Sequence, residues 1–206
     1  ILSDGRVVNP DLLKVDSFIT HQVDPELMDA AAEDFKEHFK DKGITKIVTI
    51  ESSGISPAIL TAQKMKLPLV IFKKQASKAL NGSLLQTEVT SFTTSKTFEL
   101  TVSPKFIKSE DHVLIIDDIL ANGEAITGAI RLLRIAHATV GGVGILVEKC
   151  FQPGRKKIEE AGMDLKTVRL FECSLFLSML PLHMDRPQKV LAFILNSVNI
   201  MDEIDR

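Results

Sequence analysis

Residues 113–125 read VLIIDDILANGEA, and this stretch decides the fold. Its apolar run favours a buried strand, two acids end that strand, small residues form a loop, and Glu124 opens a helical pattern. An apolar strand followed directly by a helix is typical of a parallel sheet covered by helices. The stretch therefore predicts an α/β fold.

Similar apolar runs recur along the chain and alternate with helical patterns. Asp24 is expected to cap a helix that begins at Pro25 and ends before Gly43. Further helices are expected at about residues 55–66, 124–136 and 154–161. The strand-like runs lie at residues 46–51, 68–72, 112–118, 142–149 and, more weakly, 165–170. This order predicts one domain spanning residues 1–206, with a central, mostly parallel sheet flanked by helices.

The segment between the second and third of these runs has a different composition. Residues 87–103 are rich in Thr, Ser, Val and Phe, which favours a two-stranded excursion over another strand and helix. We expect residues 75–103 to form part of a small hood beside the sheet. Residues 171–206 form an apolar tail, which we expect to pack on the core or on a second subunit.

Composition limits the class of ligand and the compartment. The chain has 206 residues, and its 25 Lys and Arg nearly balance its 27 Asp and Glu, so the basic footprint of a nucleic-acid binder is missing. Cys150 and Cys173 are too few for a disulfide framework, which fits a reducing cytoplasm. Apolar runs fall short of the roughly 20 residues that cross a bilayer. We expect a soluble cytoplasmic protein with a small-molecule ligand.

Asp117 and Asp118, the acid pair, end the strand at the edge where open α/β sheets bind ligands. Carboxylates accept hydrogen bonds from vicinal sugar hydroxyls and stabilise positive charge on a ribose ring, whereas they bind a polyanion poorly. The helix that follows offers unpaired N–H groups to a phosphate. The residues alone leave two other interpretations open: the acids cap the helix, or they bind Mg²⁺ in another α/β fold.

A second loop of this kind follows the first sheet strand. Residues 51–54 read ESSG, and Ser56 with Pro57 is placed as the N-cap and first residue of the next helix. Lys73 and Lys74 follow the second strand, where a flexible cation would neutralise an anion. The alternatives are an ordinary turn and solvated surface lysines.

Lys149 ends an otherwise apolar strand, so its charge requires a partner. A 6-oxopurine presents acceptors at O6 and N7, which an ammonium group would satisfy, whereas the 6-amino group of adenine requires an acceptor. The alternative is a lysine that reaches solvent or pairs with Glu148.

The motif at residues 113–125 resembles the phosphoribosyl pyrophosphate (PRPP) motif of type I phosphoribosyltransferases, with Asn122 where Ser or Thr is common. Residues 12–22, 43–54 and 148–155 extend the resemblance to the branch that acts on 6-oxopurines, over about residues 2–170. It implies transfer of the 5-phosphoribosyl group to xanthine, giving xanthosine 5′-monophosphate and pyrophosphate in purine salvage. It also implies Mg²⁺ bound through PRPP, and a homodimer.

The resemblance assigns a role to each matching position. Asp117 and Asp118 become the catalytic acids that hold the ribose hydroxyls. Residues 10–22 become the other part of the hood, which folds over the base. The PRPP contacts are Ala121, Asn122, Gly123, Glu124 and Ala125 for the 5-phosphate, and Ser52, Ser53, Gly54 and Lys74 for pyrophosphate. The xanthine contacts are Leu13, Thr20 and Lys149.

Two positions change the expected chemistry. An acid beside a phosphate repels it, so we expect Glu124 to contribute its backbone N–H and to turn its side chain outward. Thr20 stands where an amide-bearing Asn is expected, and one hydroxyl cannot replace both amide functions. The oxopurine class is therefore better defined than the preference for xanthine over guanine or hypoxanthine.

Rival interpretations use the same PRPP motif. A non-catalytic, PRPP-sensing purine regulator would share it, but it should also carry a DNA-binding module or a basic stripe. A transferase acting on guanine or hypoxanthine, on adenine, or on orotate is the enzymatic alternative. The group that accepts the purine proton is not identified.

Overall fold

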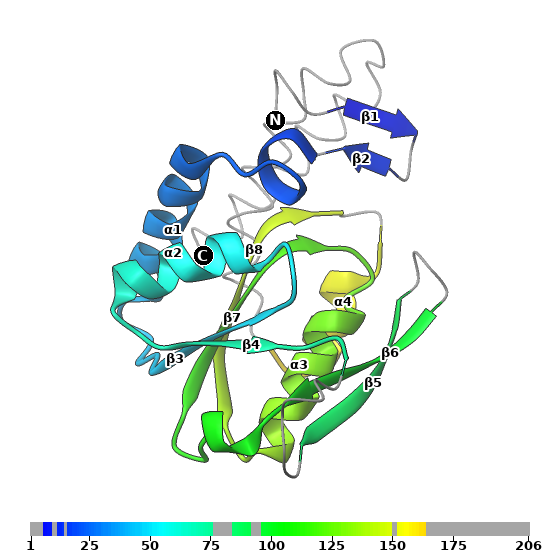
Figure 1. Ribbon diagram of the computed structural model, residues 1–206. Helices are drawn as coiled ribbons and strands as arrows, with labels where there is room; N and C mark the ends of the chain where they lie inside the picture. Colours follow the sequence, from blue (N-terminus) through cyan, green and yellow to red (C-terminus); the bar gives the residue numbers. More distant parts are fainter. Residues whose placement is uncertain are drawn as a thin grey trace.

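The computed structural model describes residues 6–9, 12–14, 16–75, 84–91, 96–149 and 152–163. Four parallel strands form the central sheet in the order β4–β3–β7–β8 (Figure 1). They are β3 (Lys46–Ile50), β4 (Leu69–Phe72), β7 (His112–Leu120) and β8 (Thr139–Glu148). The predicted mostly parallel α/β sheet is confirmed. The fifth predicted strand, at residues 165–170, and the tail at 171–206 lie outside the described residues.

Helices cover both faces of this sheet. α1 (Pro25–Phe39) and α2 (Ile55–Met65) pack on one face, where Phe35 and Phe39 contact residues of β3 and β7. α3 (Glu124–Ile135) and α4 (Gly154–Glu160) pack on the other, with Ile130 and Ile158 in the larger core cluster. Neighbouring residues of one strand, such as Ile47 and Val48, point to opposite faces and join different clusters. Burial on both faces explains why these strands are continuously apolar.

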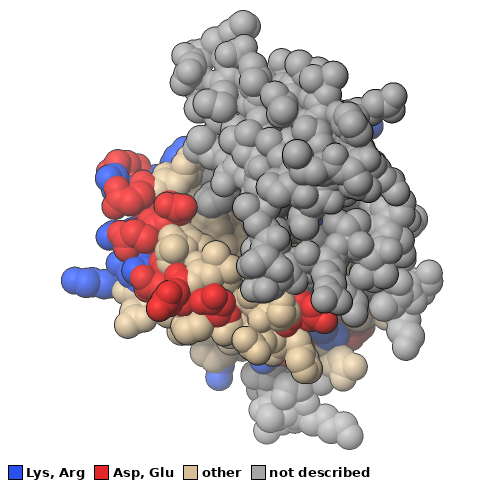
Figure 2. All heavy atoms as spheres, turned by 90° about the horizontal axis from the view of Figure 1, so that it is seen from above, with Lys and Arg blue, Asp and Glu red and all other residues tan. Residues whose placement is uncertain are grey.

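Helix α1 begins as the sequence predicts. The Asp24 carboxylate accepts hydrogen bonds from the backbone N–H groups of Glu26 at 3.0 Å and Leu27 at 3.1 Å, with Pro25 as the first helical residue. The outer side of α1 carries interleaved charges, visible on the left of Figure 2. Lys64 of α2, for example, lies 3.0 Å from carboxylate oxygens of both Asp29 and Glu33. Both signs alternate there, so this face presents no basic stripe among the described residues.

The helix predicted at about residues 55–66 is confirmed as α2, but the predicted cap at Ser56 is wrong. Ser56 does not cap this helix, because α2 begins at Ile55 with Gly54 as its N-cap and has no side-chain capping bond. The helix starts two residues earlier than this cap implies, and Ile55 donates its backbone N–H to the Ser52 carbonyl at 3.1 Å. The Ser56 hydroxyl instead donates to the Ser53 carbonyl at 3.2 Å.

The predicted two-stranded excursion is confirmed as an antiparallel pair, β5 (Leu85–Ser91) and β6 (Lys96–Val102). It packs beside α3, and Val89 and Leu100 join the core cluster on that face (Figure 1). A second pair, β1 (Arg6–Asn9) and β2 (Leu12–Lys14), precedes a π-helical turn at Asp16–Thr20. The pairing of β1 with β2 was not anticipated.

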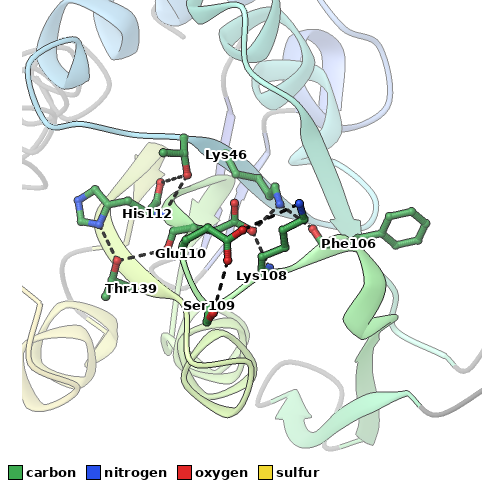
Figure 3. A network of polar contacts seen from close by, with 9 residues as sticks. Lys46, Phe106, Lys108, Ser109, Glu110, His112 and Thr139 are labelled. Atoms are coloured by element: carbon green, nitrogen blue, oxygen red, sulfur yellow. Dashed lines mark hydrogen bonds and ion pairs between the residues drawn. The ribbon is translucent and has the colours of Figure 1, made fainter.

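A polar network ties the strands together at the sheet edge where β7 and β8 begin (Figure 3). Lys46 pairs with the buried Asp111 carboxylate and donates to the Phe106 carbonyl at 2.8 Å. Asp111 also accepts the Lys108 N–H at 2.7 Å, and the His112 ring lies 2.7 Å from the Thr139 hydroxyl. Side-chain hydrogen bonds and an ion pair stabilise the end of the sheet where these strands begin. The candidate site lies at the opposite end, where the strands finish.

Candidate active site

The acid pair lies near the carboxyl end of β7, which continues two residues beyond the predicted end at Asp118 and finishes at Leu120. Asp117 is 8% exposed, and its carboxylate accepts the Asp118 backbone N–H at 3.0 Å. Burial raises the pKa of the Asp117 carboxyl well above its ordinary value, and the neighbouring Asp118 charge raises it further. Ionised Asp117 is therefore poorly stabilised in the free protein. A cationic ligand would supply the missing stabilisation.

This raised pKa makes Asp117 a cost to stability at neutral pH. Above the ordinary value of 3.8, the unfolded chain releases this proton more readily than the folded chain, so the cost grows as pH rises towards the folded-state pKa. Asp117→Asn should raise the melting temperature at pH 7 by roughly 2–4 °C, the effect of ~1 kcal/mol in a chain of this size. The gain should vanish below pH 3.8.

Thermal melts between pH 3 and pH 8 test this expectation, with the exposed Asp41→Asn as the control. A destabilised Asp117→Asn protein, or a gain that is the same at every pH, would contradict the stated cause.

The loop at residues 121–125 connects the acid pair to α3. Gly123 has φ +77°, and α3 begins after it without a side-chain capping bond, so its first backbone N–H groups point at whatever lies before the helix. A Cβ on Gly123 would lie 2.9 Å from the Gly154 carbonyl oxygen, and one on Gly154 would lie 2.3 Å from the Ala121 carbonyl oxygen. The start of α4 is thus packed directly on this loop, which fixes its backbone for an anion.

The loop at residues 51–54 meets the acid pair because β3 and β7 are neighbours in the sheet. A Cβ built on Gly54 would lie 2.4 Å from the Asp117 Oδ1 atom and 2.6 Å from the Thr49 Oγ1 atom. Thr49 is fully buried, and its hydroxyl has no hydrogen-bond partner among the described residues. The loop backbone therefore lies against Asp117, at the same edge as the 121–125 loop.

Glu51 fastens this loop to the end of β4. Its carboxylate accepts the Lys74 backbone N–H at 2.7 Å and a hydrogen bond from the Lys73 ammonium at 3.3 Å. Glu51 was not singled out from the sequence, since its two contacts are more than twenty residues away. Lys73 is therefore paired with Glu51, and 42% of its side chain is exposed.

Lys74 lines a pocket of about 140 Å³ beside the 121–125 loop. Its ammonium lies 5.6 Å from the centre of the Phe98 ring, a cation–π distance, and Phe98 comes from β6. One side of the pocket is therefore formed by β5 and β6, and the other by the end of β7 and the 121–125 loop. Its lining is Lys74, Val89, Thr90, Phe98 and residues 119–126.

Lys149 follows β8, and its backbone N–H donates to the Leu120 carbonyl at 2.8 Å, which ties it to the end of β7. The preceding Glu148 is 8% exposed, and Arg155 of α4 donates to both of its carboxylate oxygens. The Glu148–Arg155 pair holds the segment after β8 in place beside the 121–125 loop.

The early segment reaches the same region through the 16–20 turn. Phe18 and Ile19 are buried in a cluster with Val147 of β8 and with Ile119 of β7. Thr20 is exposed at the end of this turn. Leu13 lies in β2 opposite Val7, and its side chain lies outside the described part of the molecule. Roles in base binding remain predictions for Leu13 and Thr20.

The parallel sheet, the acid pair at its ligand edge and the two loops beside that pair are the features expected of an enzyme that binds a phosphorylated sugar. The chain belongs to the phosphoribosyl transferase family: the model of the phosphoribosyl transferase domain matches residues 20–172.

Two relatives in sequence are xanthine phosphoribosyltransferases. Over 165 residues the chain is 62% identical to a xanthine phosphoribosyltransferase of Agathobacter rectalis, covering 80% of this chain and 86% of the relative. It is 57% identical to xanthine phosphoribosyltransferase 1 of Clostridium botulinum strain Hall, covering 80% and 87%.

Solved structures share the architecture. The adenine phosphoribosyltransferase of Giardia lamblia complexed with 9-deazaadenine superposes with a TM-score of 0.63 at 25% identity, covering 73% of this chain and 81% of that one. The adenine phosphoribosyltransferase of Rhodothermus marinus gives 0.58 at 30% identity, covering 65% and 74%. The type I phosphoribosyltransferase fold is therefore confirmed.

Among the described residues, no three His, Cys, Asp or Glu residues lie together as a metal-binding group. No described helix is both long and apolar enough to span a bilayer.

Proposed function

We propose that the protein transfers the 5-phosphoribosyl group of PRPP to xanthine, giving xanthosine 5′-monophosphate and pyrophosphate in purine salvage. One observation carries the proposal: the buried Asp117 and the half-buried Asp118 stand beside two loops whose following helices begin without side-chain caps, at the ligand edge of the sheet. The named relatives at 57–62% identity support xanthine as the base.

PRPP would bind across the carboxyl ends of β3 and β7. The 5-phosphate meets the backbone N–H groups of residues 121–125, and Asp117 and Asp118 accept hydrogen bonds from the ribose hydroxyls. Pyrophosphate lies on residues 52–54, with Lys74 supplying positive charge. The packing of Gly54 against Asp117 supports this placement of the substrate. It brings the 51–54 loop beside the acid pair, which leads into the 121–125 loop, so the two loops could bind adjoining parts of one PRPP molecule.

Mg²⁺ fits this site as a companion of PRPP. Mg²⁺ binds through one or two carboxylates together with substrate phosphates, rather than in a cage made by the protein alone. We expect PRPP to bring the ion through its phosphate oxygens, while the acid pair binds the ribose hydroxyls. When bound, the ion would neutralise pyrophosphate charge as the leaving group departs.

Transfer breaks the bond between ribose C1 and a pyrophosphate oxygen, whose electron pair leaves with pyrophosphate. A purine nitrogen bonds to C1 and gives up its proton. The ribose gains cationic character before the new bond is complete, and the acid pair stabilises that charge. Asp117 is suited to this step because burial disfavours its negative charge, and a cationic ribose would stabilise that charge as it forms. The hood, made of residues 10–22 and 75–103, would keep water from the activated ribose.

Lys149 determines the class of base in this proposal. Its ammonium donates to O6 or N7 of an oxopurine, whereas the amino group of adenine would meet a donor with a donor. The Glu148–Arg155 pair and the Leu120 contact support its position at the edge of the site. Leu13 and Thr20 complete the base contacts, with Thr20 offering one hydroxyl.

A panel of bases tests the proposal. Purified protein with PRPP and Mg²⁺ should form nucleotide from xanthine in preference to guanine, hypoxanthine, adenine and orotate. Lys149→Met should lower kcat/KM for xanthine by roughly 100-fold, because a buried acceptor on the base loses its donor.

The panel also separates the rivals. Faster turnover of guanine or hypoxanthine than of xanthine would change the preferred base but keep it an oxopurine. Faster turnover of adenine would contradict the proposed contact between Lys149 and the base. PRPP binding without turnover of any base would replace the enzyme by a PRPP-sensing regulator.

The proposal extends to the assembly and compartment of the enzyme. The family resemblance supports a homodimer, which light scattering of the purified protein tests. The scarcity of cysteines supports the cytoplasm as the place of the reaction.

A further inference from the structure

Glu124 presents an electrostatic problem at the proposed phosphate site. It is the first residue of α3 and lines the pocket beside the 121–125 loop. A carboxylate at a helix N-terminus interacts favourably with the same partial positive charge that would attract the 5-phosphate. Left to itself, it would compete with the phosphate and repel it.

Lys157 of α4 neutralises the Glu124 charge. Its ammonium forms an ion pair with the Glu124 carboxylate, and the two side chains are 34% and 31% exposed. The carboxylate therefore has a cation on it, and its side chain is engaged with α4. With its carboxylate engaged in this way, Glu124 would offer the phosphate its backbone N–H.

The backbone around this pair is held closely. Gly123 and Gly154 approach so tightly that neither has room for a Cβ, and Lys157 lies one helical turn after Gly154. Thr127 of α3 donates its hydroxyl to the Gly123 carbonyl at 3.0 Å, next to the start of the helix. The close approach of the two glycines therefore fixes where α4 begins, and so the side from which Lys157 approaches Glu124.

The other cations of α4 have partners elsewhere. Arg155 donates to Glu148, and Lys156 lies 3.8 Å from Glu160 on the same helix, with both side chains largely exposed. Lys156 is therefore a matched control for Lys157: it has the same charge and helix and lies one residue away, but it has a different partner.

We propose that Lys157 is a positioning residue for the 5-phosphate: it neutralises the Glu124 carboxylate and holds it on α4, so that the N-terminus of α3 accepts a phosphate dianion. The inference rests on the proposed function, in which residues 121–125 bind the 5-phosphate. Lys157 acts through Glu124, so its removal should matter only while Glu124 carries a charge.

The test compares steady-state kinetics of Lys157→Met and Lys156→Met with PRPP as the varied substrate. Lys157→Met should raise KM for PRPP about three- to tenfold, the size expected for one partly exposed charge, with kcat within about twofold of the native value. Lys156→Met should leave KM within about 1.5-fold of native, because its partner Glu160 lies away from the loop.

Removing the unpaired charge should restore binding. In the Lys157→Met protein, Glu124→Gln should return KM for PRPP to within about twofold of native, which a mere loosening of α4 would not allow. The rise in KM should also shrink at high salt, since both side chains are partly exposed.

Each result has a definite meaning. A KM that is unchanged in Lys157→Met, a rise of equal size in Lys156→Met, or no recovery on adding Glu124→Gln overturns the inference. Failure of the proposed function is distinguishable, because it would appear as absent nucleotide formation in the native protein.

Discussion

Replacing both acids, Asp117→Asn with Asp118→Asn, should lower kcat/KM for PRPP by a factor of about 10³ or more. In the proposed mechanism each carboxylate faces positive charge that develops on the ribose only in the transition state, and losing one such electrostatic contact costs about 10²–10³ in rate. Asn keeps the size and hydrogen-bonding capacity of each side chain while removing its charge. The measurement is xanthosine 5′-monophosphate formation under saturating xanthine.

A charge-matched control makes the result specific. Asp34→Asn with Asp41→Asn removes two exposed carboxylates from the region of α1 and should leave turnover unchanged. Retention of more than about a tenth of native activity in the Asp117 and Asp118 double variant would exclude the acid pair from the transition state.

The second large effect is expected for Gly54→Ala. The new methyl would lie 2.4 Å from the Asp117 Oδ1 atom, 2.6 Å from Thr49 Oγ1 and 3.2 Å from the Asp117 Cα atom. Asp117 and Thr49 are buried on adjacent strands, so the 51–54 loop must move away from the acid pair. We expect a loss of about 2–3 kcal/mol in stability and of at least about 100-fold in kcat/KM, because the two halves of the PRPP site separate.

Gly43→Ala serves as its control. Gly43 has φ +66°, and a Cβ there would have nothing within 4 Å, so the cost is backbone strain alone, about 1 kcal/mol, with activity retained. Thermal melts and turnover of both variants check the pair. If Gly54→Ala kept native turnover, the close approach of the 51–54 loop to Asp117 would not matter for catalysis.

The elements that the sequence predicted well are those set by local patterns. β3, β4, β7 and β8 are apolar on both faces and end in turns, and α1 begins at a side-chain cap followed by proline, so composition alone locates them. Residues 113–125 gave both the acid pair and the start of α3. The strand predicted at residues 142–149 begins three residues later than β8, which starts at Thr139. Glycine is unfavourable in strands, so Gly141 and Gly142 obscured this start in the sequence. In the fold, Gly142 makes room for the Phe39 ring and Gly141 for the His112 ring.

The parts that escaped the sequence depend on contacts between distant residues. The Glu51 carboxylate accepts a hydrogen bond from the backbone after β4. The Glu124–Lys157 pair joins α3 to α4 through two residues that lie more than thirty positions apart in the sequence. Ser56 has the right composition for a cap, yet the packing of Gly54 against Asp117 starts the helix earlier. Local patterns located the loops, while tertiary packing decided how each one is held.

A crystal structure of the protein with bound xanthosine 5′-monophosphate tests the central claim most directly. The account predicts the 5′-phosphate on the backbone N–H groups of residues 121–125, the ribose hydroxyls on Asp117 and Asp118, and the Lys149 ammonium beside the base. A nucleotide bound elsewhere, or with its phosphate away from the start of α3, would contradict it.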